Sequence, residues 1–259
     1  MKTSAPGKLF LAGEYAVLEG GPALLSPVRQ RARVSITPNV DSKVITYTTT
    51  PKEYSLKEAL RTLPLLKATV SQLGHLKKLE GALISLDTSD FYRDGVKVGL
   101  GSSAALIVAL IKSLEPEIDK QEHLRKAIQC HSAFQRGIGS GADIALATEN
   151  SPIVFRLGQP PTPIMLPNNL HLLAIWSGEP ASTTKYVTTV AKWGENNPES
   201  YQEKINELCR TAAELIECLK KGNSESFLAK VEEYDRGLEH LSSISGANFY
   251  NETHMNMRK

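Results

Sequence analysis

Hydrophobic and polar residues alternate along two early segments of the chain, which is the pattern of a strand with one buried face. Residues 29–38 (RQRARVSITP) alternate, and residues 43–50 (KVITYTTT) repeat the pattern with β-branched side chains. A short apolar run at 8–12 predicts a further strand, and Pro51 is expected to end the strand that begins at Lys43. The chain is therefore predicted to begin with strands.

Helical spacing replaces this alternation after residue 54. Apolar residues recur at three- and four-residue intervals over 55–76, where Pro64 is expected to break or kink the helix. Strands and helices then follow one another without a regular strand–helix–strand rhythm, which favours an α+β fold. The remaining predicted strands are 81–89, 151–157 and 170–177, and the remaining predicted helices are 104–114, 120–135, 182–193, 199–221 with a stop at Gly222, and 224–241.

Composition narrows the classes of protein that this pattern fits. The chain of 259 residues is long enough for a well-buried core in one large or two packed domains. Its 30 basic and 28 acidic residues give a net charge of +2, which argues against a nucleic-acid partner held by bulk charge. Neither a signal-peptide core nor a membrane-spanning run is apparent, and the three cysteines have no metal-ligand spacing. We therefore expect a cytoplasmic protein with no membrane partner.

The glycine-rich stretch 98–103 (VGLGSS) stands directly before the apolar helix at 104–114. Glycines let a ligand approach the backbone closely, and the first amide groups of a helix have no partner within the helix. With the hydroxyls of Ser102 and Ser103, this turn predicts an anion site that fits nucleotide phosphates. An ordinary turn with a serine N-cap is the alternative, and the stretch alone does not decide between them. Ala104 takes the place of the third glycine of a dinucleotide-binding motif.

Two other stretches join this turn in a recognisable order. Residues 5–24 (APGKLFLAGEYAVLEGGPAL) precede it, and residues 131–147 (HSAFQRGIGSGADIALA) follow it. Together the three stretches resemble the motifs of the GHMP kinase superfamily, whose members phosphorylate small metabolites. The GEYAV form of the first stretch and the spacing in the last resemble the phosphomevalonate kinase branch of that superfamily. The resemblance spans most of residues 3–190.

The resemblance implies a two-domain fold and a reaction. It implies a ribosomal protein S5 domain 2-like N-terminal domain at 1–155 and a ferredoxin-like C-terminal domain at 156–259. The implied reaction transfers the γ-phosphoryl group of ATP, with Mg²⁺, to the small-molecule substrate phosphomevalonate. Mevalonate as acceptor is the nearest alternative, and a catalytically impaired binding protein is an alternative of another class. The protein is expected to be a monomer or a homodimer.

The resemblance also assigns catalytic and nucleotide-binding residues. Lys8 and Asp143 are expected to be catalytic. The alternatives are that Lys8 is a solvated residue at the end of a strand and that Asp143 is a helix N-cap. Ser103 is the expected Mg²⁺ ligand. The nucleotide-binding residues are expected to be Gly99, Leu100, Gly101, Ser102, Ser103 and Ala104.

Acceptor binding is assigned to three separate stretches. Glu14 and Tyr15 belong to the first motif, and core packing explains Tyr15 almost as well. Simple capping is the alternative at the predicted helix start at 182–185, while His131 is expected to serve helix packing. The other expected acceptor residues are Arg136, Ser140, Ser182, Thr183 and Lys185.

One motif of the superfamily is missing from the sequence. Its third motif is a second glycine-rich loop, and residues 243–246 (SISG) hold too little glycine to replace it. We therefore expect a shortened form whose second domain lacks strands that relatives carry. This absence is the ground for the binding-only alternative.

Overall fold

A computed structural model describes residues 1–135, 137, 139–178, 183–250 and 252–257. The chain divides into two compact units. The first unit holds residues 1–9 and 26–151, and the second holds 10–25 and 152–259. Two long strands, β1 (Lys2–Ala12) and β2 (Ala23–Pro38), contribute residues to both units. The mixed α+β class is as predicted, and the domain boundary at residue 155 stays a prediction.

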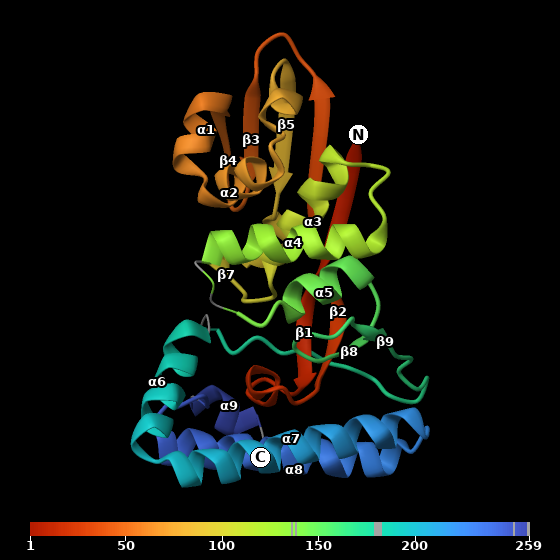
Figure 1. Cartoon of the computed structure of the whole chain (residues 1–259), viewed down its shortest axis with the longest axis vertical. Helices are drawn as coiled ribbons and strands as arrows, with labels where there is room; N and C mark the ends of the chain where they lie inside the picture. The colour runs from red at the N-terminus through yellow and green to blue at the C-terminus, as the bar shows by residue number, and fades with distance from the viewer. Residues whose placement is uncertain (136, 138, 179–182, 251, 258–259) are drawn as a thin grey trace. The chain divides into compact units, whose positions relative to one another are not determined.

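A mixed sheet forms one layer of the first unit (Figure 1). Its strands run in the order β4 (Pro51–Ser55), β3 (Lys43–Tyr47), β5 (Ala82–Asp87) and β2, and β1 also pairs with β2. β3 and β5 are parallel, whereas β5 lies antiparallel to β2 with Arg33 opposite Asp87. A short hairpin of β6 (Tyr92–Arg93) and β7 (Val96–Lys97) leads to the glycine-rich turn.

The strand β4 was not predicted, and the role expected of Pro51 was wrong. Pro51 begins β4 rather than ending β3, and it lies opposite Tyr47 in the β3–β4 hairpin. Proline has no N–H to donate to a ladder, so it is tolerated at the first residue of an edge strand. β4 is such an edge strand, and its residues are mostly exposed. Its sequence therefore lacks the apolar alternation of a half-buried strand.

The helices of the first unit pack into a core with the sheet. Pro64 separates α1 (Leu56–Thr62) from α2 (Pro64–Leu73), as predicted. Three more helices follow, namely α3 (Ser102–Leu114), α4 (Lys120–Gln135) and α5 (Ala142–Glu149). Most residues of α3 are buried, as expected for a helix that is apolar on nearly every side. The core of this unit gathers side chains of α2, α3, α4 and the sheet.

The second unit is mainly helical. Residues Ala23–Leu25 of β2 pair with β8 (Ile153–Phe155), which pairs with β9 (Thr162–Pro163). The helices are α6 (Thr183–Asn196), α7 (Pro198–Lys220), α8 (Ser224–Ser245) and α9 (Glu252–Met257), together with a 3₁₀ turn at Ala16–Glu19. The predicted helices are thus confirmed in type and approximate extent.

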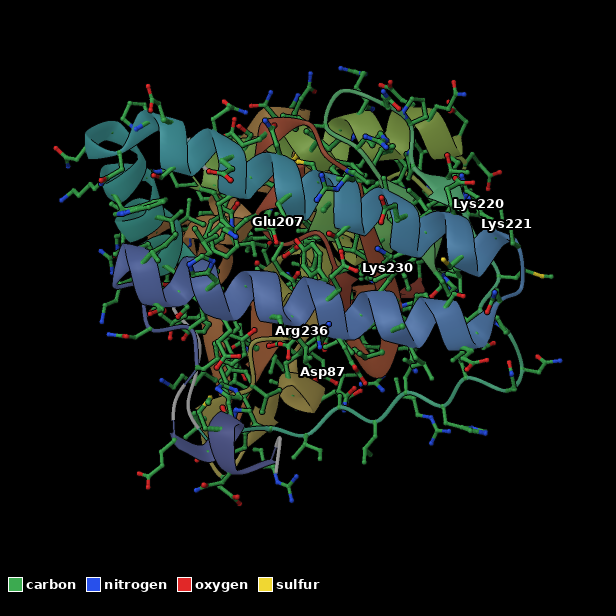
Figure 2. The ribbon with its side chains drawn as sticks, turned by 90° about the horizontal axis from the view of Figure 1, so that it is seen from below. Asp87, Glu207, Lys220, Lys221, Lys230 and Arg236 are labelled. Carbon is green, nitrogen blue, oxygen red and sulfur yellow. The ribbon has the colours of Figure 1, made fainter. Side chains whose placement is uncertain are left out.

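Helices α7 and α8 lie side by side, as Figure 2 shows. Lys230 of α8 pairs with Glu214 of α7 at 2.6 Å, and a Cβ at Gly237 would lie 2.8 Å from Leu208 Cδ2. The absence of a side chain at Gly237 therefore allows the close approach of the two helices. None of the helices in the described ranges has the length and apolar character that crossing a membrane requires.

The strand predicted at 170–177 is wrong. These residues have no regular secondary structure, and Leu172, Leu173 and Ile175 are exposed. An apolar run becomes a strand only when a neighbouring strand accepts and donates its backbone hydrogen bonds. β9 is the outermost strand on this side of the sheet in the described part of the chain, and it pairs with β8. Residues 170–177 therefore have strand-like composition without a ladder partner.

We expect the core of the first unit to depend on α3. Leu110 is fully buried, so Leu110→Ala should lower the free energy of unfolding by about 2–5 kcal/mol through lost burial and a residual cavity. Leu76→Ala removes the same atoms at a side chain that is 44% exposed, and it should cost well under half as much. Urea denaturation followed by circular dichroism measures both variants. Equal losses would contradict this assignment of the core.

Stability should also decline in mild acid because of His123. Burial of its imidazole, partly offset by the hydrogen bond to the Val108 carbonyl oxygen (Nε2···O 3.0 Å), holds the pKa of His123 below its ordinary value. The unfolded chain then binds this proton more readily, so the free energy of unfolding falls as the pH drops below about 6.5. His123→Gln should reduce the difference between urea denaturation curves recorded at about pH 7.5 and pH 5.5. An unchanged difference would exclude this role of His123.

Candidate functional site

The glycine-rich turn joins the β6–β7 hairpin to the start of α3. Gly99 and Gly101 have φ values of 80° and 75°, a region in which other residues are strained. The backbone N–H of Lys8 donates to the Leu100 carbonyl oxygen at 2.9 Å, which fixes the turn against β1. Gly101 is the N-cap of α3, and no side chain caps this end, so the alternative of a serine N-cap is wrong. The first amide groups of α3 are therefore available to an anion.

Lys8 and Asp143 meet beside this turn. Lys8 Nζ lies 3.0 Å from Asp143 Oδ1, and the two side chains are 20% and 28% exposed. A Cβ at Gly101 would lie 2.8 Å from Lys8 Cγ and 3.6 Å from Asp143 Oδ2. The lack of a side chain at Gly101 thus lets the ion pair lie against the loop. Asp143 is not a helix N-cap, because Gly141 occupies that position at the start of α5.

The two serines of the turn differ in their surroundings. Ser102 is buried, whereas Ser103 is partly exposed and its Oγ lies 3.5 Å from His131 Nε2. Burial lowers the pKa of His131; Asp143 opposes this shift and Lys8 adds to it. The imidazole is therefore neutral at neutral pH. Ser103 offers the more accessible hydroxyl to a ligand of the turn.

Lys97 is a cation near the turn that the motif analysis missed. It ends β7, two residues before Gly99. Although Lys97 is exposed, the surrounding protein removes part of the water around its ammonium group, and this desolvation lowers its pKa. Its position two residues before the first glycine was the signal that the sequence offered.

Glu14 and Tyr15 belong to the second unit. Tyr15 is buried and stacks on Phe249 with ring centroids 4.8 Å apart, and Tyr186 of α6 meets Phe249 edge-on at 5.6 Å. Burial raises the pKa of Tyr15 far above its ordinary value, and Glu14 and Tyr186 raise it further. The Tyr15 phenol therefore stays protonated and serves as a hydrogen-bond donor or a packing group rather than as a base.

The structure describes only some of the remaining residues that were expected to bind the acceptor. Ser140 Oγ accepts a hydrogen bond from the Ala142 N–H at 3.3 Å and so supports the turn before α5. Lys185 is exposed on the first turn of α6. Arg136, Ser182 and the side chain of Thr183 lie outside the described residues.

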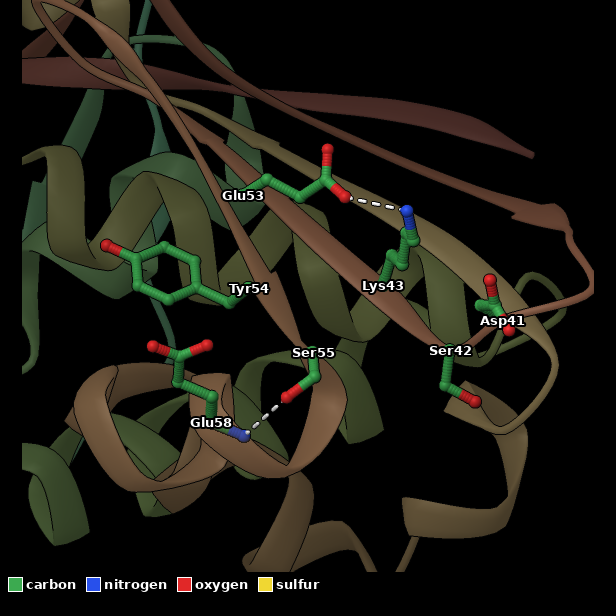
Figure 3. Close-up of a pocket in the computed structure, with 7 residues that line it drawn as sticks. All are labelled: Asp41, Ser42, Lys43, Glu53, Tyr54, Ser55 and Glu58. Atoms are coloured by element: carbon green, nitrogen blue, oxygen red, sulfur yellow. Dashed lines mark hydrogen bonds and ion pairs between the residues drawn. The ribbon is translucent and has the colours of Figure 1, made fainter.

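A hollow at the β3–β4 hairpin and the start of α1 lies apart from these motifs (Figure 3). Lys43 Nζ pairs there with Glu53 Oε1 at 2.8 Å, and Ser55 Oγ accepts from the Glu58 N–H at 3.2 Å. Each of these groups already has a protein partner, and none belongs to the predicted site. Among the described residues, no group of three or more His, Cys, Asp or Glu side chains is placed to hold a metal ion.

The chain is similar to known proteins of one family. The family model described as "GHMP kinases N terminal domain" matches residues 65–150. The chain is 25% identical to the phosphomevalonate kinase of Streptomyces sp. (strain CL190), over 95% of this chain and 80% of that protein. It is 31% identical to the mevalonate kinase of Archaeoglobus fulgidus, over 77% of this chain and 66% of that protein.

The fold comparison agrees with the sequence comparison. The structure of Streptococcus pneumoniae phosphomevalonate kinase in complex with phosphomevalonate and AMPPNP superimposes with a TM-score of 0.75. Its sequence is 21% identical, and the match covers 94% of this chain and 81% of that chain. The turn before α3, its place in the α+β fold and these similarities lead to one assignment: the chain belongs to the GHMP kinase family and is a phosphotransferase.

Proposed function

We propose that the protein transfers the γ-phosphoryl group of MgATP to phosphomevalonate and forms diphosphomevalonate. The observation that carries this proposal is the Lys8–Asp143 ion pair at the glycine-rich turn, with Nζ and Oδ1 3.0 Å apart. Phosphoryl transfer depends on positioning and on neutralising charge, and a cation held beside a phosphate-binding turn supplies both. Phosphomevalonate and mevalonate kinases among the relatives support this class of acceptor.

The turn is the proposed nucleotide site. Backbone amides of residues 99–104 and the positive end of α3 would face the phosphates, because no side chain caps that helix. Lys97 adds a partly desolvated cation near this turn. The nucleotide-bound neighbour from Streptococcus pneumoniae, which carries AMPPNP, supports this use of the fold.

The residues of the turn fit a Mg²⁺ ion that is bound mainly by the phosphates of the nucleotide. Mg²⁺ keeps several waters and takes few protein ligands, so the accessible Ser103 hydroxyl together with phosphate oxygens is an adequate set. When bound, the ion offsets negative charge on the phosphates.

The role of Asp143 depends on the acceptor. The phosphate of phosphomevalonate has a second pKa of about 6, so near pH 7.5 its attacking oxygen carries no proton. A bond forms between that oxygen and the γ-phosphorus while the bond to the bridging oxygen of ADP breaks, and no base is needed. Asp143 then serves to hold the Lys8 ammonium group against the transferring group. A mevalonate hydroxyl would instead lose its proton to the Asp143 carboxylate.

We assign acceptor binding to the first motif and to the start of α6. Tyr15, as a permanently protonated phenol, can donate to an acceptor oxygen, and Glu14 adjoins it. Lys185, in the first turn of α6, supplies a positive charge for the acceptor. Arg136, Ser140, Ser182 and Thr183 remain proposed acceptor residues. Cytoplasmic location and a monomeric or homodimeric state also remain predictions.

Purified protein assayed with MgATP and each acceptor tests this function. We expect phosphomevalonate to be the preferred acceptor, with diphosphomevalonate as product. A marked preference for mevalonate would favour the alternative that the 31% identical Archaeoglobus relative supports. Binding of MgATP without turnover of either acceptor would indicate the alternative of a catalytically impaired binding protein.

The ion pair should be essential for turnover. Lys8→Met should lower kcat/KM for both acceptors by about 100-fold or more, because the transferring charge loses its positioned cation. Asp143→Asn removes a base as well as a partner of Lys8, so it should reduce mevalonate turnover more than phosphomevalonate turnover. Steady-state assays with both acceptors measure these ratios.

The pair Lys43–Glu53 of Figure 3 supplies the control. Lys43→Met removes the same charge from an exposed ion pair in the same unit, and it should leave both kinetic constants unchanged. If Lys8→Met behaved like Lys43→Met, the proposed mechanism would be wrong.

A further inference from the structure

We propose that His131 is a positioning residue for the nucleotide site, which presupposes the function proposed above. Its imidazole accepts a hydrogen bond from the Ser103 hydroxyl through Nε2, and this would leave the lone pairs of Ser103 Oγ available to a cation carried by the nucleotide. The sequence interpretation of His131 as a packing residue accounts for its burial but not for the position of Nε2.

The contact between the two side chains is the first support. His131 Nε2 lies 3.5 Å from Ser103 Oγ, across 28 residues of sequence and between two different helices. This distance is at the long limit of a hydrogen bond. Hydrogen bonds of active sites are often long without ligand and shorten when the ligand binds. Ser103 is also the accessible serine of the turn, while Ser102 is buried.

The burial of the ring is the second support. His131 is 6% exposed, and Phe134, one turn further along α4, stacks near it with ring centroids 6.3 Å apart. A side chain enclosed in this way has little rotamer freedom, so it can fix the direction of a hydroxyl that would otherwise rotate freely. A residue needed only for packing would require no nitrogen facing the turn.

The charged groups that act on the ring are Lys8 and Asp143, which form an ion pair with each other. For Nε2 to accept the hydrogen bond from Ser103, the ring must carry its proton on Nδ1.

Binding of the nonhydrolysable nucleotide AMPPNP, measured by calorimetry on the full chain, tests this role without any acceptor. His131→Leu keeps an apolar side chain in the core but removes the nitrogen, and it should weaken binding in Mg²⁺ by about 3- to 10-fold. His131→Gln places an amide oxygen near the position of Nε2 and should restore most of this loss. With EDTA in place of Mg²⁺, the effect of His131→Leu should disappear.

A double-mutant experiment with Ser103 distinguishes a positioning role of His131 from a purely structural one. In a Ser103→Ala background, His131→Leu should produce no further loss of binding, because the hydroxyl that it orients is gone. His123→Leu is the matched control, since His123 is a buried histidine of the same helix whose Nε2 contacts the Val108 carbonyl oxygen instead. It should change the thermal midpoint but not nucleotide affinity.

The outcomes that overturn the proposal are distinct. Equal losses in His131→Leu and His131→Gln, additive effects with Ser103→Ala, or a loss that persists in EDTA would each exclude the positioning role. Unchanged nucleotide binding in His131→Leu would exclude it while leaving the proposed kinase function intact. Failure of the unmodified protein to bind AMPPNP would overturn the proposed function and this inference together.

Discussion

The ion pair between Lys8 and Asp143 is the contact on which the candidate site depends. It joins β1 to the first turn of α5, and the missing side chain of Gly101 leaves room for it. Two opposite charges that are only partly exposed stabilise each other more than a surface pair does, because less water screens them. The pair therefore holds the Lys8 side chain beside the turn. Such preorganisation is the main requirement for phosphoryl transfer.

The surroundings of the turn extend this arrangement. The N–H of Lys8 holds the Leu100 carbonyl, so the same residue that supplies the cation also fixes the backbone of the turn. His131 lies on α4, with its Nε2 3.5 Å from Ser103 Oγ of α3, and the charges of Lys8 and Asp143 act on its imidazole. The backbone of the turn, the Ser103 hydroxyl and the Lys8 ammonium group are thus linked through neighbouring contacts in the first unit.

The second unit contributes chemistry of a different kind. Tyr15 is enclosed by Phe249, next to Tyr186, and its phenol cannot ionise under ordinary conditions. Tyr15 therefore offers a hydrogen-bond donor and aromatic surface instead of a proton acceptor. In residues 170–177 of this unit, strand-like composition is not accompanied by strand pairing, and Leu172, Leu173 and Ile175 are exposed.

The sequence by itself determined the elements whose formation is local and the family to which the chain belongs. Pro64 separates two helices, and apolar spacing defines α3, α4, α7 and α8, because these features depend on residues a few positions apart. The three motifs indicated the GHMP kinase family and selected Lys8 and Asp143. Tertiary structure decided what long-range pairing controls: β4 at the sheet edge, the unpaired 170–177 and the meeting of Lys8 with Asp143 across 135 positions of sequence. It also placed His131 Nε2 at Ser103, since the direction of a side chain in a helix depends on what packs against it.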